Sequence, residues 1–139
     1  MSASQLSELT DSLTDMSNIQ NALNWFEIYV ADLSRAKSFY QKVLDITMAP
    51  MESETCEGVM FPYEEGIVSG GLLKVEHCQP GPGGTLVYLN ADGKLDAIIA
   101  RIKEAGGKMV LEKMEIPPHG FIAVFEDCEG NHVGLHSIS

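Results

Sequence analysis

Basic residues are scarce in this chain of 139 residues, which has nine Lys and Arg against 20 Asp and Glu. The formal net charge is −11, and the first basic side chain is that of Arg35. Proteins that bind nucleic acid neutralise phosphates with clustered Lys and Arg. We therefore expect no nucleic-acid partner.

Cysteines and long hydrophobic runs are also scarce. The three cysteines, Cys56, Cys78 and Cys128, are odd in number, and none of them forms the Cys-x-x-Cys pair of zinc or redox sites. No segment approaches the ~20 apolar residues of a membrane-spanning helix. Residues 1–23 contain neither the basic residues nor the continuous apolar stretch of a secretion signal. These observations predict reduced thiols, a cytoplasmic location and no membrane contact.

The length and a composition of 45% hydrophobic and 21% charged residues are typical of one globular domain. Such a domain buries enough surface to fold without disulfides or a structural metal. Residues 1–23 carry Leu, Ile and Met at helical spacings of three and four among many polar residues. We expect this N-terminal extension to be an amphipathic helix or partly disordered, and the domain itself to span residues 24–139.

The domain contains two halves with the same order of predicted elements: a strand, a helix and three further strands. The first module spans residues 24–78, a linker rich in Gly and Pro follows at 79–83, and the second module spans 84–139. The sequence therefore predicts an α+β fold of paired βαβββ modules. The predicted strands are 24–30, 47–51, 56–63, 67–75, 85–90, 108–116, 121–126 and 132–138, and the predicted helices are 33–44, capped by Asp32, and 94–105.

Four segments carry a family resemblance: WFEIYVADLSRAKSFY at 25–40, SGGL at 69–72, KEAGGK at 103–108 and FEDCEGNHVGL at 125–135. In this order they resemble the glyoxalase, bleomycin-resistance and extradiol-dioxygenase superfamily, also called the vicinal oxygen chelate superfamily. The resemblance implies a cup-shaped mixed sheet with the functional site inside the cup. It also implies a homodimer, because relatives commonly build the cup from modules of two chains. The fold hosts lyases, epimerases, dioxygenases and drug-binding proteins, so it does not fix the function.

Relatives with a metal site place His, Gln or Glu ligands on the first and last strands of each module. The resemblance carries these positions onto Trp25, Gly70 or Gly71, Thr85 and Gly134. None of these residues is a His, Cys, Asp or Glu donor for a divalent ion. The chain therefore resembles a glyoxalase-like subgroup without the usual metal ligands, and we expect no metal and no other cofactor.

Two histidines of the last predicted strand do not replace those ligands. His132 and His136 are four residues apart, which in a strand separates their side chains by ~13 Å. One ion cannot bridge that distance. An atypical metal centre built from Glu27, His136 and a third donor stays open as an alternative.

Glu27 is the main catalytic candidate, because it interrupts an otherwise apolar first strand. Alternation puts it on one face with Trp25 and Tyr29, and the resemblance makes that face the inside of the cup. There the carboxylate would be partly desolvated, which raises its pKa and suits it to general acid or base catalysis. His136 is the second candidate, as a proton carrier or as a donor to a ligand oxygen. Purely structural roles for both side chains remain open.

Thr85, Val87 and His132 share this face by alternation, and Tyr63 is expected to reach it, so that together they would line a pocket of apolar and hydrogen-bonding character. Gly70, Gly71 and Gly134 have no side chains and are expected to leave room for a ligand, or else to mark bulges. The predicted ligand-binding residues are Trp25, Tyr29, Tyr63, Thr85, Val87 and His132.

Three functions stay open. The first is a glyoxalase-like small-molecule-binding protein that acts as a metal-independent lyase or isomerase with Glu27 as general base. The second is a drug- or metabolite-sequestering protein of the bleomycin-resistance type, and the third is a metal-dependent lyase or dioxygenase with atypical ligands. The only arginines, Arg35 and Arg101, fall in predicted helices, which disfavours glutathione adducts because their carboxylates need cationic partners. The excess of acidic over basic side chains favours a neutral or cationic ligand.

Overall fold

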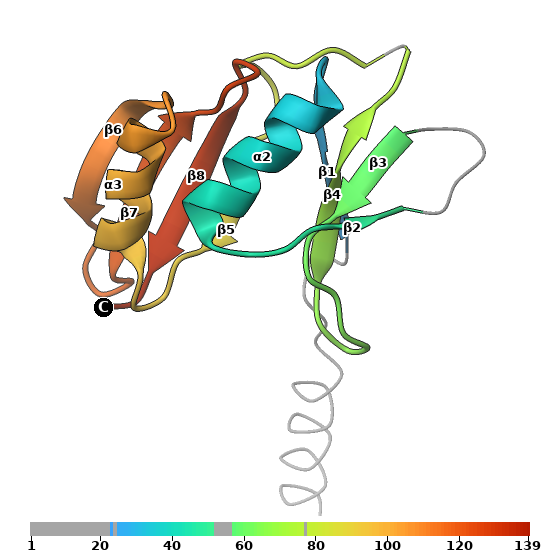
Figure 1. Cartoon of the computed structure of the whole chain (residues 1–139). Helices are drawn as coiled ribbons and strands as arrows, with labels where there is room; N and C mark the ends of the chain where they lie inside the picture. The colour runs from blue at the N-terminus through green and yellow to red at the C-terminus, as the bar shows by residue number, and fades with distance from the viewer. Residues whose placement is uncertain (1–22, 24, 52–56, 77) are drawn as a thin grey trace, which may run out of the picture.

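The computed structural model of this chain describes residues 23, 25–51, 57–76 and 78–139 (Figure 1). The predicted N-terminal helix, apart from Leu23, and Cys56 lie outside the described residues. Within the described part, no helix is both long enough and apolar enough to cross a membrane.

In the described residues the fold consists of two four-stranded mixed sheets and two helices (Figure 1). The strand orders are β1-β4-β3-β2 and β5-β8-β7-β6. In each sheet the first strand of the module pairs in parallel with the last, and the other pairs are antiparallel. This arrangement confirms the predicted α+β fold of paired βαβββ modules. The strands are β1 Trp25–Tyr29, β2 Ala49–Pro50, β3 Glu57–Met60, β4 Ser69–Lys74, β5 Tyr88–Asn90, β6 Lys108–Glu115, β7 Phe121–Glu126 and β8 His132–Ser137.

Both helices lie within one residue of their predicted bounds. The helix α2 spans Leu33–Leu44, and the Asp32 side chain caps it by accepting a hydrogen bond from the Arg35 backbone N–H. Such a cap satisfies one of the free N–H groups of the first turn. The helix α3 spans Leu95–Glu104 and is followed by Gly106 at φ 88°, where a residue without a side chain turns the backbone away.

The two modules share one hydrophobic core around Tyr40 of α2. Its ring is fully buried and lies 5.7 Å from the ring of Phe61 in the first module and 6.3 Å from that of Phe125 in the second. Burial of one such side chain contributes about 1.5–3 kcal/mol. The two helices lie beside each other in front of the sheets (Figure 1), and α2 also contacts β3 and β4.

Four strands are shorter than predicted by three residues or more. The strand β2 covers only residues 49–50 of the predicted 47–51, β3 57–60 of 56–63 and β4 69–74 of 67–75, and β5 begins at Tyr88 rather than at Thr85. Of these, β2 and β5 are edge strands with a single hydrogen-bonding neighbour, so fewer backbone bonds hold their ends. One bond of the β5 ladder still continues upstream, from the Gly134 N–H to the Val87 carbonyl.

A buried carboxylate organises the turn between β7 and β8. Asp127 accepts hydrogen bonds from the Tyr40 hydroxyl at 2.8 Å and from the backbone N–H groups of Glu129 and Asn131 at 2.8 and 2.9 Å. The Asn131 side-chain amide donates a fourth bond at 3.2 Å. The turn that precedes β8 is therefore fixed to α2 of the other module.

The neighbouring Glu129 ties the same turn to the start of α2. Its carboxylate accepts hydrogen bonds from the backbone N–H groups of Ala31 and Asp32 and forms an ion pair with Arg35 at 2.7 Å. The Glu129 side chain is only 1% exposed. Together, Asp127 and Glu129 fix the position of β8 relative to the end of β1.

Candidate functional site

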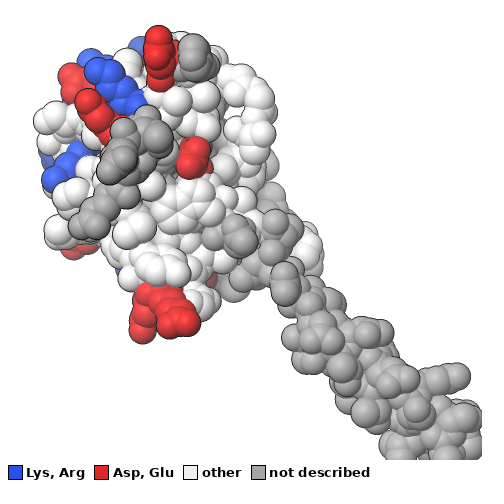
Figure 2. Space-filling model, turned by 90° about the vertical axis from the view of Figure 1, so that its right-hand side faces the viewer, with Lys and Arg blue, Asp and Glu red and all other residues white. Residues whose placement is uncertain are grey.

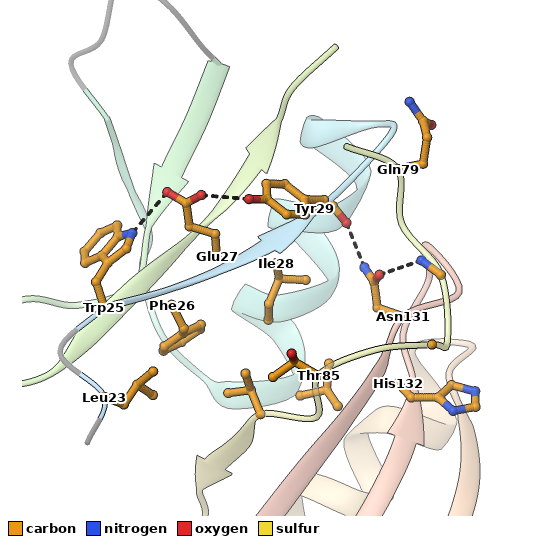
Figure 3. Close-up of a pocket in the computed structure, with 14 residues that line it drawn as sticks. Leu23, Trp25, Phe26, Glu27, Ile28, Tyr29, Gln79, Thr85, Asn131 and His132 are labelled. Atoms are coloured by element: carbon orange, nitrogen blue, oxygen red, sulfur yellow. Dashed lines mark hydrogen bonds between the residues drawn. The ribbon is translucent and has the colours of Figure 1, made fainter. Parts of the chain in front are cut away.

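A cavity of about 640 Å³ lies between β1 and the start of β8, where the linker between the modules crosses (Figure 3). Its lining combines aromatic, aliphatic and hydrogen-bonding side chains and contains no Lys or Arg. The structure brings six of the predicted site residues together here: Trp25, Glu27, Tyr29, Thr85, Val87 and His132.

Residues of β1 alternate between two surroundings. Phe26 and Ile28 point away from the side that carries Glu27, toward the side of Thr85 (Figure 3), and both pack against the core and line the cavity from that side. Trp25, Glu27 and Tyr29 project together from the other face, as the alternation predicts. The side of the molecule seen in Figure 2 is mostly uncharged, with separate acidic side chains, and the basic side chains visible there gather toward one edge.

The Glu27 carboxylate is held between its two aromatic neighbours. The Trp25 Nε1–H donates to Oε2 at 3.3 Å, and the Tyr29 hydroxyl donates to Oε1 at 3.0 Å (Figure 3). The expected desolvation of this carboxylate is wrong, because Glu27 is an exposed residue. Two neutral donors orient the group instead, and each oxygen keeps acceptor capacity for a ligand.

The hydrogen bond to Glu27 raises the pKa of Tyr29 to about 12, with smaller contributions from burial and from Cys78. The phenol therefore stays protonated, and remains a donor, well above its ordinary value of 10.0. Because folding raises the pKa of Tyr29, the protonated phenol contributes its full stabilisation of the fold below pH 10. This contribution is lost as the pH rises from 10 to about 12.

Replacing Glu27 with Ala is expected to return the pKa of Tyr29 toward 10, because the largest cause of the elevation is gone. At pH 11 the Tyr29 ring should then be mostly ionised in the variant and mostly protonated in the original chain. Carbon-13 NMR of Cζ-labelled tyrosine, with the resonance assigned through Tyr29→Phe, measures this difference. An unchanged Tyr29 titration in Glu27→Ala would show that the bond does not hold the proton.

Asn131 is a lining residue that the sequence analysis did not single out. Its amide nitrogen donates to the Tyr29 carbonyl at 2.8 Å, and its oxygen accepts from the Gly81 N–H at 2.8 Å. The side chain thus joins the end of β1, the linker and the turn at Asp127 (Figure 3). The EGN sequence before β8 signals a turn, but not these partners.

His132 lies at the start of β8, on the wall of the cavity opposite β1 (Figure 3). It is half-buried, and its Nε2 lies 3.5 Å from the Glu126 carboxylate on β7. The Glu126 carboxylate therefore lies beside the His132 imidazole at the edge of the cavity.

The structure does not bring His136 to Glu27. His136 lines a second cavity, of about 600 Å³, together with Tyr88 and Ile122, and its Nε2 lies 2.7 Å from the His119 carbonyl oxygen. The physical reason is that only the start of β8 approaches β1, whereas its far end lies beside β5 and β7. The prediction that His136 is a partner of Glu27 is therefore wrong.

Tyr63 also lies outside the main cavity. Its side chain is 57% exposed and lines a third cavity, of about 500 Å³, with Met60 and Ile67. Trp25 lines both this cavity and the main one. Tyr63 lies in the loop between β3 and β4 and is absent from the lining of the main cavity, so it does not complete that cavity.

The glycines expected to leave room for a ligand are covered by neighbouring side chains. A Cβ atom at Gly70 would clash with the carbonyl oxygen and the ring of Phe26, and one at Gly134 would clash with the Tyr88 ring. At Gly71 a Cβ would lie 2.9 Å from the Val59 carbonyl oxygen. The interpretation of these residues as ligand space is wrong.

The residues at the site do not fit a divalent metal. Nowhere in the described part of the chain do three His, Cys, Asp or Glu side chains lie together in a way that could hold an ion. A catalytic centre of this kind needs about three protein ligands. Of these residue types, the main cavity is lined by Glu27 and His132, and His136 lines a different cavity.

Comparison with known proteins gives consistent results. The model of the Glyoxalase/Bleomycin resistance protein/Dioxygenase superfamily matches residues 22–135. The mycobacterial protein CFP32, which carries a provisional glyoxylase name, is 30% identical over 114 residues in both Mycobacterium bovis and Mycobacterium tuberculosis. That match covers 81% of this chain, but the chain spans only 42% of the length of CFP32.

Solved structures show the same fold. A glyoxylase/bleomycin resistance protein/dioxygenase domain from Frankia sp. EAN1pec has a TM-score of 0.67 and 18% identity, with 86% of this chain and 98% of that chain covered. TnmS3, an antibiotic binding protein from Streptomyces sp. CB03234, has a TM-score of 0.60 and 26% identity, with 88% and 98% covered.

Proposed function

The chain belongs to the Glyoxalase/Bleomycin resistance protein/Dioxygenase superfamily, and we propose that it binds a neutral or cationic small organic molecule in the cavity between β1 and β8, without a metal ion. The observation that carries this proposal is the lining of that cavity. It offers aromatic and aliphatic surface with a few hydrogen-bonding groups, which is typical of small-molecule sites.

The charge of the lining argues against anionic ligands. Glu27 contributes a carboxylate, and no Lys or Arg on the lining balances it. A ligand with several carboxylates, such as a glutathione adduct, would need cationic partners there. The antibiotic-binding relative TnmS3 supports a role in binding rather than in turnover.

A metal-independent lyase or isomerase is the second proposal, and the free acceptor capacity of Glu27 favours it. Each carboxylate oxygen accepts one protein hydrogen bond, so a substrate proton can still be accepted. In this case Glu27→Gln should lower the turnover of a bound substrate by about 10²–10⁴-fold. In a pure binding protein neither form yields a product.

Trp25 provides the readout for ligand binding, because it is the only tryptophan and lines the cavity. The test uses N-phenyl-1-naphthylamine, a neutral fluorophore that accepts energy from tryptophan, and its anionic 8-sulfonate analogue. We expect the neutral probe to bind about tenfold more tightly than the sulfonate. Equal affinity for both probes would contradict the proposal.

A pair of loop variants locates the probe. Gly83 lines the cavity, and a Cβ placed there meets open space, so Gly83→Phe should fill part of the cavity and weaken the neutral probe about tenfold. Leu86→Phe, at an exposed residue outside the lining, is the matched control and should bind as the original chain does. Unchanged binding by Gly83→Phe would place the probe elsewhere.

We also propose a cytoplasmic homodimer. The second sheet exposes apolar side chains at the second cavity: Tyr88, 45% exposed, and Ile138, 70%, line it, and Met114, 44%, lies opposite its lining residue Ile122. Exposed apolar side chains of this kind are typical of protein contacts.

Sedimentation equilibrium at micromolar concentration should give the mass of two chains. Met114→Glu is expected to weaken the dimer, because a charge would be buried on that face. Ile67→Glu, at a residue that is 58% exposed on the loop before β4, is the control and should remain dimeric. A monomeric original chain would rule the dimer out.

A further inference from the structure

The linker between the modules forms one wall of the main cavity, and few bonds hold it. Its residues Gln79, Gly81 and Gly83 line the cavity. Among the described residues, the stretch 79–86 makes a single hydrogen bond to the rest of the domain, from the Gly81 N–H to the Asn131 side-chain oxygen at 2.8 Å (Figure 3). The middle of this wall is therefore attached to the domain at one point.

Both ends of this stretch join hydrogen-bonded backbone. Before it, the Cys78 N–H donates to the carbonyl of Val75, which follows β4 directly, at 3.2 Å. After it, the Val87 carbonyl accepts from the Gly134 N–H of β8 at 2.8 Å. The two ends are therefore fixed points, and movement is confined to the residues between them.

Between these fixed points the chain packs loosely. Residues 82–86 are exposed. A Cβ atom at Gly81, Gly83 or Gly84 would meet no atom within 4 Å outside the adjacent residues. Segments with few packed contacts and few backbone hydrogen bonds open at the lowest cost in free energy. We call residues 79–86 the strap, because they are fixed at both ends and loosely held between them.

Asn131, to which the strap is bonded, is itself firmly held. Its backbone N–H and its side-chain amide donate to the Asp127 carboxylate at 2.9 and 3.2 Å, and the amide also donates to the Tyr29 carbonyl at 2.8 Å. Both of these partners can only accept, so they fix the amide with its oxygen toward Gly81. Asp127 is buried and also bonded to Tyr40. Asn131 is therefore the fixed half of the contact, and the strap is the half that can move away.

We propose that the strap is the gate of the main cavity and that Asn131 is its latch. The strap opens when the Gly81 N–H leaves the Asn131 oxygen, and it closes over a bound ligand when this bond forms again. The inference rests on the proposed binding function, because it describes how a ligand enters and leaves the same cavity. Asn131 acts here as a positioning residue through the strap.

The first test breaks the latch from the side of the strap. Gly81→Pro removes the N–H that bonds to Asn131 and leaves in place both bonds that the Asn131 amide donates. Gly81→Ala keeps the N–H, and its Cβ meets open space, so it is the matched control. Folding of both variants is checked by circular dichroism.

The quantity compared is the dissociation rate of N-phenyl-1-naphthylamine, followed by stopped-flow energy transfer from Trp25. This rate should be about fivefold higher in Gly81→Pro than in Gly81→Ala, because one neutral hydrogen bond no longer holds the strap closed. Equal rates in the two folded variants, or slower release from Gly81→Pro, would overturn the inference.

A second measurement uses the original chain. In amide hydrogen exchange followed by NMR, the Gly81 N–H should be protected at least about tenfold less than the Gly134 N–H, because the strap opens while β8 stays folded. Saturating N-phenyl-1-naphthylamine should slow exchange at Gly81 about tenfold, because the ligand binds under the closed strap. Equal protection of the two N–H groups, or exchange at Gly81 that the probe leaves unchanged, would overturn the inference.

The two proposals fail in different ways. If N-phenyl-1-naphthylamine binds the original chain and Gly83→Phe blocks it, the binding function stands whatever the strap does. If Gly81→Pro then releases the probe no faster than Gly81→Ala, only the gate is lost.

Discussion

Replacing Asp127 with Ala is expected to lower the free energy of unfolding by about 3–4 kcal/mol. Asp127 is 4% exposed, and its carboxylate accepts four hydrogen bonds, among them one from the hydroxyl of the fully buried Tyr40. Alanine would leave that hydroxyl and part of the Asn131 amide without partners. An unsatisfied buried donor costs about 1–3 kcal/mol, so the separate losses add to a large effect.

Urea unfolding monitored by circular dichroism measures this change. Tyr40→Phe removes only one of the four donors and should cost about 1–2 kcal/mol. Asp96→Ala is the control, because its carboxylate is 81% exposed and its ion pair with Lys113 is a surface contact worth less than about 1 kcal/mol. A loss below about 1 kcal/mol in Asp127→Ala would contradict the role given to this network.

The same network predicts a pH dependence at high pH. Burial, followed by the charge of Asp127, raises the pKa of Tyr40 well above its ordinary value of 10.0. The contribution to stability is therefore complete below pH 10 and is lost as the pH rises above 10 toward the folded-state pKa. The Tyr40→Phe variant should lack this part of the alkaline destabilisation.

Replacing Gly70 with Ala is expected to lower the free energy of unfolding by about 2–3 kcal/mol. Gly70 lies opposite Phe26 in the parallel pair of β4 and β1, and a methyl group there would clash with the Phe26 carbonyl oxygen and ring. The oxygen belongs to the backbone of β1 and cannot rotate away. The strand that carries Trp25, Glu27 and Tyr29 would therefore have to move.

Two measurements follow this displacement: urea unfolding, and the emission maximum of Trp25, which should shift in the folded Gly70→Ala variant. Gly83→Ala is the matched control, because a Cβ there has no neighbour within 4 Å and its stability should change by less than about 0.5 kcal/mol. If Gly70→Ala were as stable as Gly83→Ala, the close contact between the two strands would not be real.

Local patterns predicted the parts of the site that one strand determines. The alternation in residues 25–29 placed Trp25, Glu27 and Tyr29 on one face, and the structure shows them there. The apolar stripe and the Asp32 cap predicted α2 to the residue. These features depend on neighbours within a few positions in the chain.

Features that depend on distant segments were not predictable in this way. The Asn131 amide bonds to residues 102 and 50 positions away, and no local pattern specifies such partners. Alternation placed His132 and His136 on one face of β8, but it could not show that only the start of this strand approaches β1. Likewise, composition does not show that aromatic rings cover Gly70 and Gly134.

Nitrogen-15 NMR of the protein dialysed against a chelator, titrated with N-phenyl-1-naphthylamine, tests the central claim most directly. A ligand held between β1 and β8 without a metal should shift the signals of the Trp25 indole N–H and the Asn131 side-chain amide, while Asn90 and His136 stay unchanged. Shifts centred on Asn90 and His136, or binding that begins only when a divalent cation is added, would contradict the account.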